Sequence, residues 1–451
     1  MPEKAKRLSG FGRFPWVETH LLRPERIREV PQALSRGPVI GRGLGRAYGD
    51  AAVAPGGRTV SSLRLNRFLS FDAERGIVEV EGGVRIDELI RVLLPRGYFP
   101  SVVPGTRQVT VAGALACDIH GKDHHRRGSF SRHVLDFELF LPSGDRITVT
   151  RERDEALFLA TAGGMGLTGF ISRLRLRLLP VESAWMRVDT ERTKDFEEAL
   201  ERFHASDASY DYSVAWIDCL ARGRALGRSV LLRGNFARRS DLDRRRATRP
   251  FEAPGGAPWR VPWTAPPGLL RPATVRAFNT AYYHAHPKHA RDRLVGLDAF
   301  FFPLDRVADW NRLYGPRGFL QYQLVVPEPE GALALRRILE RLAAAGAASF
   351  LAVLKRFGPA EPGALLSFPR PGYTLALDLP NRGEETFALL RSLDRIVLDA
   401  GGRVYLAKDA RLDPLTFRRM YPEYERWLAI RRRVDPEGRL ASALSRRLEI
   451  P

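Results

Sequence analysis

The chain has 451 residues, 44% of them hydrophobic and 27% charged, which is enough to build a large core divided over two domains. It has only two cysteines, so a disulfide framework is excluded, and no apolar run is long enough to cross a membrane. The basic start of the chain lacks the apolar region of a secretion signal, and we expect a cytoplasmic protein.

The formal net charge is +20, and almost all of the positive charge is arginine. The basic runs Arg244–Arg246 and Arg431–Arg433 are short and lack interleaved aromatic residues, so we expect no nucleic acid partner. Two interpretations stay open. The arginines reflect a general bias in composition, or they serve a phosphate-bearing ligand or an acidic bilayer surface.

The first motif is a glycine loop, Gly41-Arg42-Gly43-Leu44-Gly45-Arg46, directly after an apolar strand at 39–40. A Rossmann dinucleotide site needs a third glycine and a helix that begins at the loop. Here the following residues, AYGDAAVAPGG, have no helical period, so the loop is predicted to run from strand to strand. Such a loop either holds a phosphate with its backbone N–H groups or is simply a tight turn.

The next elements have clear periodicities. Residues 68–84 are predicted to form a hairpin, and a helix is predicted from Ile86 to Leu94, with Gly97 as its stop. A second hairpin turns at 142–145. Further glycine-rich segments lie at 104–130 and 163–171, again between strands. Three such segments favour one extended, backbone-lined groove for a single long cofactor.

The second half has a different pattern. A helix is predicted at 194–204, strands at 212–220 and 229–236, and an irregular Pro-rich connection at 253–268. Strands are then predicted at 319–327, 349–358, 373–380 and 403–409, with helices at 331–346 and 385–402 between them. This β-α-β-β-α-β order predicts an antiparallel sheet with helices on one face.

Several polar residues interrupt the apolar alternation of these strands: Gln321, Gln323, Lys355 and Lys408. In isolation, a solvent-exposed side of the sheet is the favoured explanation for them. Lysine is rare in this chain, however, and a compact ammonium in a strand suggests a specific role. For Lys408, the alternative is a structural ion pair with Asp409.

Taken in order, the motifs GRGLGRAYGD, PGTRQVTVAGALACDIHGKDHH, GGMGLTGFI, YLAKDAR and RRRVDPEGRLAS resemble the vanillyl-alcohol-oxidase/PCMH family of FAD proteins. Within it, the chain is most similar to the flavin oxidase subunits of decaprenylphosphoryl-ribose 2-epimerases. The resemblance implies an α+β, two-domain PCMH-type fold with an antiparallel-sheet substrate domain. The FAD domain would comprise residues 1–183 and 404–451, and the substrate domain residues 184–403.

The resemblance also implies the residues of the FAD site. They are Gly41, Arg42, Gly43, Leu44, Gly45, Arg46, Ala47, Tyr48, Gly49, Asp50, Ala51, Gly105, Thr110, Val111, Ala112, Gly113, Cys117, Asp118, Ile119, His120, Ile171 and Tyr405. Many relatives attach FAD covalently through a His in the first glycine loop. This loop has no His, so we expect non-covalent FAD, and thiol attachment at Cys117 is disfavoured.

The implied catalytic residues are Lys408, His120, Lys122 and Tyr48, among which the sequence does not identify the base. The implied substrate-binding residues are Lys122, Trp216, Gln321, Gln323, Lys355 and Lys408, although Trp216 suits a core position equally well. The histidines at 124, 125 and 133 are numerous enough to suggest a metal site, but the resemblance places the pair at 124–125 beside the cofactor channel, and we expect no metal.

The implied activity is FAD-dependent oxidation of a secondary sugar hydroxyl, at carbon 2 of a polyprenylphosphoryl-pentose. A separate NAD-dependent reductase would complete the epimerisation, and the enzyme would contact an acidic membrane peripherally. The chain departs from the mycobacterial pattern at Thr374 and Ala376, and at Phe300–Phe302, which lowers its hydrogen-bonding capacity near the substrate. The alternative is a stand-alone alditol or aldonolactone oxidase that uses oxygen.

Overall fold

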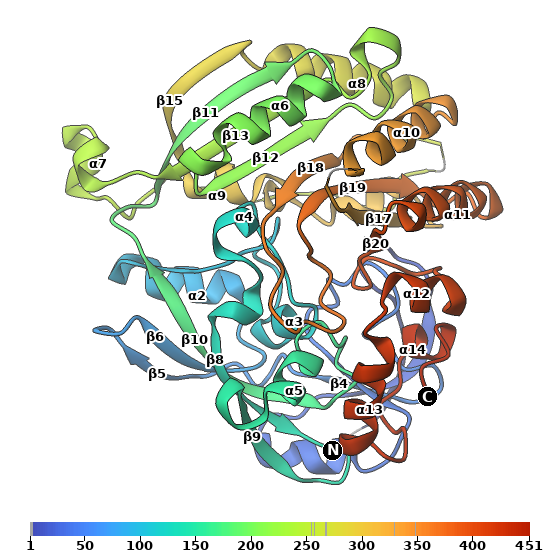
Figure 1. Ribbon diagram of the computed structural model, residues 1–451. Coiled ribbons are helices and arrows are strands. Elements are labelled where there is room, and N and C mark those ends of the chain that lie inside the picture. The colour runs from blue at the N-terminus through green and yellow to red at the C-terminus, as the bar shows by residue number, and fades with distance from the viewer. Residues whose placement is uncertain (1–2, 254, 257, 267, 329, 348) are drawn as a thin grey trace.

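The protein is described here by a computed structural model, which covers residues 3–451 except 254, 257, 267, 329 and 348. The chain forms three main sheets, of which the first two lie in the lower half of Figure 1 and the third in the upper half. Both termini lie at the lower end, beside the first sheet (Figure 1). The mixture of helices with separate, mainly antiparallel sheets confirms the predicted α+β class.

The first sheet has four strands in the order β1-β2-β4-β3. Their bounds are β1 Lys4–Leu8, β2 Val17–Leu22, β3 Val39–Arg42 and β4 Arg58–Ser61, with the short helix α1 at Val30–Leu34. β3 and β4 are parallel, and the first glycine loop is part of the connection between them. The prediction that this loop runs from strand to strand is confirmed.

The second sheet has six strands, in the order β5-β6-β10-β8-β9 with β7 paired to β10. The strands are β5 Phe68–Asp72, β6 Ile77–Glu81, β7 Tyr98–Pro100, β8 Val134–Phe140, β9 Arg146–Thr150 and β10 Phe170–Pro180. The associated helices are α2 Ile86–Leu93, α3 Val111–Ala116, α4 His124–Arg127 and α5 Arg151–Thr161. Both predicted hairpins and the helix that precedes Gly97 are confirmed; Gly97 has the left-handed φ of 82° expected of a helix stop.

The third sheet has eight strands in the order β15-β11-β13-β12-β18-β19-β17-β20. They are β11 Trp185–Thr193, β12 Tyr212–Ile217, β13 Ser229–Phe236, β15 His289–Gly296, β17 Phe319–Val326, β18 Ala352–Phe357, β19 Gly372–Pro380 and β20 Arg403–Val404. The helices α6 Phe196–Ser206, α10 Gly331–Ala344 and α11 Glu384–Asp399 pack on one face of it, as predicted (Figure 1).

Two connections complete this half. Between β13 and β15 lie α7 Arg244–Thr248, the two-residue strand β14 Trp259–Arg260, and α8 Pro272–Ala285. Figure 1 shows α8 at the top of the molecule, far from both termini. Between β15 and β17 lie α9 Leu297–Phe301, the strand β16 Val307–Ala308 and a 3-10 helix at Trp310–Tyr314. Parts of the Pro-rich connection predicted at 253–268 lie outside the described residues.

After β20 the chain returns to the first sheet. The helices α12 Pro414–Met420, α13 Tyr424–Val434 and α14 Ala443–Arg447 lie beside it, and Leu440 pairs with Val39 of β3. The strand predicted at 403–409 was too long. β20 ends at Val404, and a turn follows in which the Lys408 amide donates to the Tyr405 carbonyl oxygen at 3.0 Å.

Candidate functional site

The three glycine-rich segments of the first half meet. We call residues 41–51, 105–120 and 163–171 together the glycine cradle. A Cβ added to Gly43 of the first segment would collide with the Thr110 hydroxyl of the second. The amide of Gly163 in the third segment donates to the Leu115 carbonyl at 3.1 Å, and that of Met165 donates to Ala116 at 2.9 Å. The absence of side chains therefore allows three backbones to approach closely.

The cradle fits a phosphate-bearing cofactor. Within the described part of the chain, the backbone amides of residues 43–47 donate to no acceptor. Unused amides in a turn form a nest that binds anions. Gly105 faces open space, since an added Cβ there would meet no atom within 4 Å. Both features suit a long anionic ligand that lies along the backbone.

Two charged side chains of the first loop have structural partners. Arg42 turns back and donates to the carbonyl oxygens of Ser9 at 2.8 Å and Ala52 at 3.2 Å. The carboxylate of Asp50 accepts two hydrogen bonds from Arg447, each 3.0 Å long. Arg42 and Asp50 thus hold the loop in place, and the contact of either with a cofactor would come mainly from its backbone.

The end of the second cradle segment contacts the residue that follows β20. Tyr405 donates its hydroxyl to the Cys117 carbonyl oxygen at 2.7 Å. Burial raises the pKa of the Cys117 thiol to about 12, so the thiolate needed for covalent attachment is disfavoured. Asp118 is fully buried, with a left-handed φ of 41°, and accepts from the Ser131 amide at 2.9 Å. Ile171 is buried as well.

One face of the third sheet is polar and buried. Cross-strand register places Gln321 opposite Asp378, Gln323 opposite Ala376, and Lys355 opposite Thr374. Val353 is opposite both Ala376 and Trp216. Because side chains alternate along a strand, these residues share one face of the sheet. We call this set the polar face: Trp216, Gln321, Gln323, Val353, Lys355, Thr374, Ala376 and Asp378.

The other face carries the alternate residues, including Leu320, Tyr322 and Leu324, which belong to the main hydrophobic core. The polar face is also largely closed to solvent: Gln323 is 4% exposed and Asp378 0%. The interpretation of these residues as a solvent-exposed side of the sheet is therefore wrong. Buried polar side chains carry a desolvation cost, which favours a specific role.

Lys408 joins this face from the turn after β20. Its ammonium lies 3.8 Å from the centre of the Tyr48 ring, and the Tyr48 amide donates to the Ala407 carbonyl at 3.0 Å. Burial lowers the pKa of Lys408 to about 7, although the nearby Asp378 carboxylate acts to raise it. The proposed pairing with Asp409 is not what the structure shows, because Asp409 forms an ion pair with Arg447 at 2.9 Å.

Asp378 is the residue that the sequence interpretation missed. Burial raises its pKa to about 7, and Gln321 donates to Oδ1 at 2.5 Å. Its Oδ2 has no hydrogen-bond partner among the described residues. Burial and Asp378 together also raise the pKa of the Tyr48 hydroxyl. Tyr48, Gln321, Asp378 and Lys408 form what we call the Lys408 cluster.

His120 lies next to this cluster. Its Nε2 is 2.8 Å from the Gln323 amide nitrogen, which also donates to the Thr374 hydroxyl at 3.2 Å. Burial, followed by the charge of Lys355, lowers the pKa of His120 well below its usual value. The ring is therefore neutral, and its Nδ1 has no partner in the described structure. The cradle and the polar face thus meet at His120.

Lys122 and Lys355 form a second, cationic group. Lys122 donates to the Phe300 carbonyl and stands 4.6 Å from the Phe300 ring centre, while Lys355 reaches the Gly121 carbonyl at 3.5 Å. Burial lowers the pKa of Lys122 to about 7 and that of Lys355 to about 8. Asp123 lies beside them, and burial raises its pKa to about 7. Two partly buried ammonium groups with so little counter-charge suit an anionic ligand.

The remaining predicted residues are more peripheral. Trp216 is at the edge of the polar face, where its indole donates to the Phe350 carbonyl at 3.1 Å and its ring lies 4.7 Å from Tyr282. The histidines at 124, 125 and 133 contact Ser129, Tyr210 and Arg127 separately. No group of three metal-ligating side chains occurs among residues that the structure describes.

Comparisons with known proteins identify the family of the chain. Residues 22–150 match the FAD binding domain family, and residues 381–448 match the family described as D-arabinono-1,4-lactone oxidase. The chain is 41% identical to decaprenylphosphoryl-beta-D-ribose oxidase of Mycolicibacterium smegmatis, over 100% of this chain and 98% of the relative. It is 22% identical to L-gulono-1,4-lactone dehydrogenase of Mycobacterium tuberculosis, over 93% and 92% of the two chains. Cytokinin dehydrogenase 7 of rice is 30% identical over 46% of this chain.

Proposed function

The chain belongs to the family of PCMH-type FAD oxidoreductases that includes decaprenylphosphoryl-beta-D-ribose oxidase, and from this premise we propose its substrate and mechanism. The protein is an FAD-dependent oxidoreductase that acts on CH–OH groups. The proposed substrate is a polyprenylphosphoryl-pentose, oxidised at carbon 2 to the ketone as the first half of a 2-epimerisation.

One observation carries this proposal: the partly buried ammonium of Lys408 and the buried carboxyl group of Asp378 stand together where the cradle meets the polar face. Bound FAD supplies the acceptor for the hydride from the carbinol carbon. The hydroxyl proton must leave in the same reaction. Asp378 Oδ2 has no hydrogen-bond partner in the described parts of the chain, and the pKa of the carboxyl group is about 7, which suits a base near neutral pH. Lys408 would hold the substrate oxygen and stabilise negative charge.

The cationic group would bind the substrate phosphate. Lys122 and Lys355 are partly buried, and a phosphate between their ammonium groups would raise both lowered pKa values again. Gln321, Gln323 and His120 would orient the sugar through hydrogen bonds, with Trp216 at the outer edge. Ala376 leaves this part of the face without a polar group, so shape is expected to contribute more than hydrogen bonds there.

The cofactor would be held without a covalent bond. The unused amides of residues 43–47 support binding of its pyrophosphate, and the raised pKa of Cys117 argues against a thioether. Acid precipitation of the yellow protein should release all of its flavin. Flavin that remains in the pellet would contradict this part of the proposal and would implicate Cys117.

Two partners follow from the chemistry. The keto product needs a reductase that delivers hydride from a nicotinamide cofactor to the opposite face of carbon 2. A lipid-linked substrate resides in a bilayer, while none of the described helices is long and apolar enough to span one. We therefore propose peripheral contact with an acidic membrane from the cytoplasmic side.

A second function has specific support. The match of residues 381–448 to D-arabinono-1,4-lactone oxidase and the full-length likeness to a gulonolactone dehydrogenase favour oxidation of a free aldonolactone or alditol. The two buried lysines argue against it, because a neutral lactone has no group for them.

An anaerobic flavin-bleaching screen separates the two functions. The holoenzyme is mixed with polyprenylphosphoryl-ribose, with free alditols and with aldonolactones, and flavin absorbance is followed. Bleaching by the lipid phosphate alone supports the main proposal. Bleaching by free lactones or alditols, with none by the lipid phosphate, would replace it with the alternative.

A further inference from the structure

The segment between α7 and β15 has an unusual surface. Trp259 is 64% exposed, Trp263 72%, Leu269 47% and Phe278 46%, and we call these four residues the aromatic strip. Four of the other tryptophans, at positions 185, 216, 310 and 427, are buried. Large exposed apolar side chains that gather in one short segment are typical of an interaction surface.

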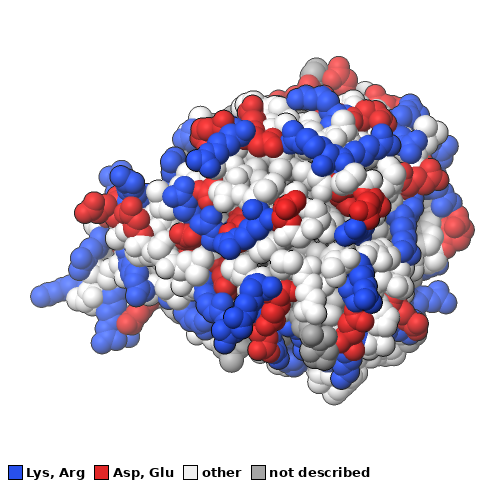
Figure 2. Space-filling view, turned by 90° about the horizontal axis from the view of Figure 1, so that it is seen from below, with Lys and Arg blue, Asp and Glu red and all other residues white. Residues whose placement is uncertain are grey.

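The charge of the same segment is one-sided. From Ala253 to Arg291 the sequence contains no Asp or Glu, while it contains the basic residues Arg260, Arg271, Arg276, Lys288 and Arg291. Of these, Arg260 also forms an ion pair with Asp309 at 3.1 Å. The face of the molecule seen from below differs, because acidic and basic side chains alternate over it (Figure 2). The overall excess of arginine therefore does not explain this segment, in which acidic residues are missing altogether.

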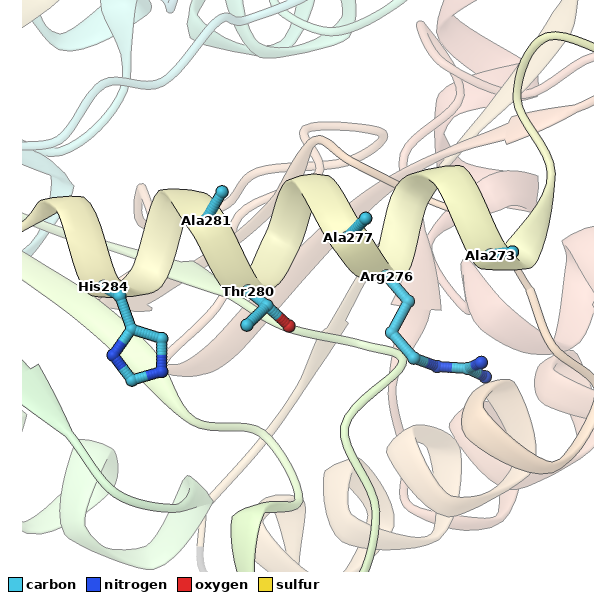
Figure 3. Close-up of a pocket in the computed structure, with 6 residues that line it drawn as sticks. All are labelled: Ala273, Arg276, Ala277, Thr280, Ala281 and His284. Atoms are coloured by element: carbon cyan, nitrogen blue, oxygen red, sulfur yellow. The ribbon is translucent and has the colours of Figure 1, made fainter.

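The exposed face of α8 continues this surface. Ala273, Ala277 and Ala281 follow one side of the helix, and Arg276, Thr280 and His284 point to the neighbouring side (Figure 3). These six residues line a shallow groove. Small side chains allow close approach to a flat partner, and the cation beside them favours a negative one.

The segment that contains the strip packs against residues near the Lys408 cluster. The Ala265 amide donates to the Arg312 carbonyl at 2.9 Å, and Leu270 packs on the aromatic cluster of Trp310, Tyr314 and Phe319. Phe319 contacts Tyr48 of the Lys408 cluster, with ring centres 5.4 Å apart.

A second connection runs through α8. Phe278 contacts Phe350, and Tyr282 packs on Trp216 at the edge of the polar face. Leu270 and the α8 residues Phe278 and Tyr282 thus connect the segment that contains the strip with residues near the polar face and the Lys408 cluster.

We propose that the aromatic strip, with Arg260, Arg271 and Arg276, is the surface by which this enzyme docks on an anionic lipid bilayer. Tryptophan rings prefer the depth of the headgroups, and arginine side chains are attracted to acidic lipids. Docking here would bring the Lys408 cluster towards the membrane that contains the substrate. This inference rests on the proposed lipid-linked substrate, but the binding itself can be measured without any substrate.

The test is sedimentation of the holoenzyme with vesicles of phosphatidylcholine alone or mixed equally with phosphatidylglycerol. We expect binding to the anionic vesicles only, and binding should weaken with added salt because the Debye length falls to about 10 Å at 0.1 M. The variants Trp259→Ser/Trp263→Ser and Arg260→Gln/Arg271→Gln/Arg276→Gln should each lose at least about ten-fold in affinity.

Matched controls carry the same changes elsewhere. Leu333→Ser/Leu415→Ser removes two exposed apolar residues, and Arg23→Gln/Arg36→Gln/Arg244→Gln removes three exposed arginines. Both should bind vesicles as the unmodified protein does. Equal losses in the control and test variants, or wild-type binding by both test variants, would overturn the proposal. A dimer that dissociates in the Trp variants, without vesicle binding, would also overturn it and assign the strip to contact between two copies.

A second measurement separates this inference from the proposed function. With a short-chain, water-soluble polyprenylphosphoryl-ribose, the Trp double variant and the Arg triple variant should reduce their flavin at the rate of the unmodified protein. With the long-chain substrate in vesicles, both should reduce it more slowly than the unmodified protein does. If no lipid phosphate bleaches the flavin while vesicle binding still depends on the strip, the function fails and the docking surface stands. If a lipid phosphate bleaches the flavin but the variants bind vesicles as the unmodified protein does, the proposed docking surface is wrong.

Discussion

The glycine cradle and the polar face solve the problem of holding a ligand in opposite ways. The cradle presents backbone amides and needs small residues so that three segments can approach one another, as at Gly43 and Thr110. The polar face presents side chains from β17, β18 and β19, and each has its place through cross-strand register. Backbone recognition suits a constant cofactor, whereas side chains can be exchanged to suit a substrate. Changes in the face should therefore affect chemistry, and changes in the cradle should affect cofactor affinity.

The largest effect is expected at Lys408. Lys408→Met removes the ammonium over Tyr48 and leaves the cradle unchanged, so the protein should fold, remain yellow and still bind substrate. Flavin reduction should slow by roughly a hundred-fold or more, the scale of one preorganised donor. Anaerobic stopped-flow absorbance measures this rate.

Two further variants complete the lysine experiment. Lys408→Arg should restore little, because a planar guanidinium does not fit the place of an ammonium. Lys194→Met, on the exposed surface before α6, is the control and should change nothing. A normal rate in Lys408→Met would make Lys408 structural and move the catalytic role to His120 and Lys122.

Asp378→Asn is expected to come next, with a loss of about a hundred-fold if the carboxylate takes the hydroxyl proton. It also changes the pH profile. The Asp378 charge raises the pKa of Lys408, so its removal lowers that pKa further. The alkaline limb of the flavin-reduction profile should therefore move to lower pH. An unchanged limb would show that the two groups do not interact in the working enzyme.

The sequence predicted these two regions unequally. The cradle was recognisable because glycines between strands signal close backbone approach wherever they finally meet. Gln321 and Lys355 were recognisable as polar interruptions, but Asp378 was not, since its importance comes from standing opposite Gln321 on a neighbouring strand. The prediction of a strand at 403–409 was wrong after Val404 for a similar reason, since the end of this strand depends on its pairing with a distant strand. Val404 pairs with Leu324 and is the last residue of β20, and the turn that follows places Lys408 beside Tyr48.

In the cradle, Gly43→Ala should weaken FAD binding by about ten-fold, because the new Cβ collides with Thr110 and separates two segments. Thr110→Ala in the same chain should recover part of the loss, although it removes the cap of α3. Flavin reduction in the fraction that retains FAD should be normal. FAD affinity is measured by flavin fluorescence during titration of the apoprotein.

Gly105→Ala sharpens the same test. Its Cβ meets no protein atom, so the melting temperature of the apoprotein should not change, and a loss of FAD affinity would report contact with the cofactor itself. Gly256→Ala, also in open space, is the matched control. If Gly105→Ala binds FAD with full affinity, the cofactor does not pass this residue.

The smallest effect concerns Asp123, between the two regions. Its pKa is raised from 3.8 to about 7, so the stability linked to its protonation is complete below about pH 4 and is lost as the pH rises through 7. Asp123→Asn removes this dependence. We compare the melting temperature of the variant with that of the unmodified protein at each pH. The difference should be roughly 2–5 °C more favourable to the variant at pH 8 than at pH 4. Equal changes at both pH values would mean that the pKa of Asp123 is the same in the folded and the unfolded protein, which would contradict the raised pKa.

The central claim is that hydride leaves carbon 2 of a lipid-linked pentose held by the polar face. It is tested most directly by anaerobic stopped-flow reduction of the flavin with polyprenylphosphoryl-ribose that carries deuterium at carbon 2, or instead at carbon 3. The account predicts several-fold slower bleaching with deuterium at carbon 2 and no change at carbon 3. An isotope effect at carbon 3 alone, or no bleaching by either compound, would contradict it.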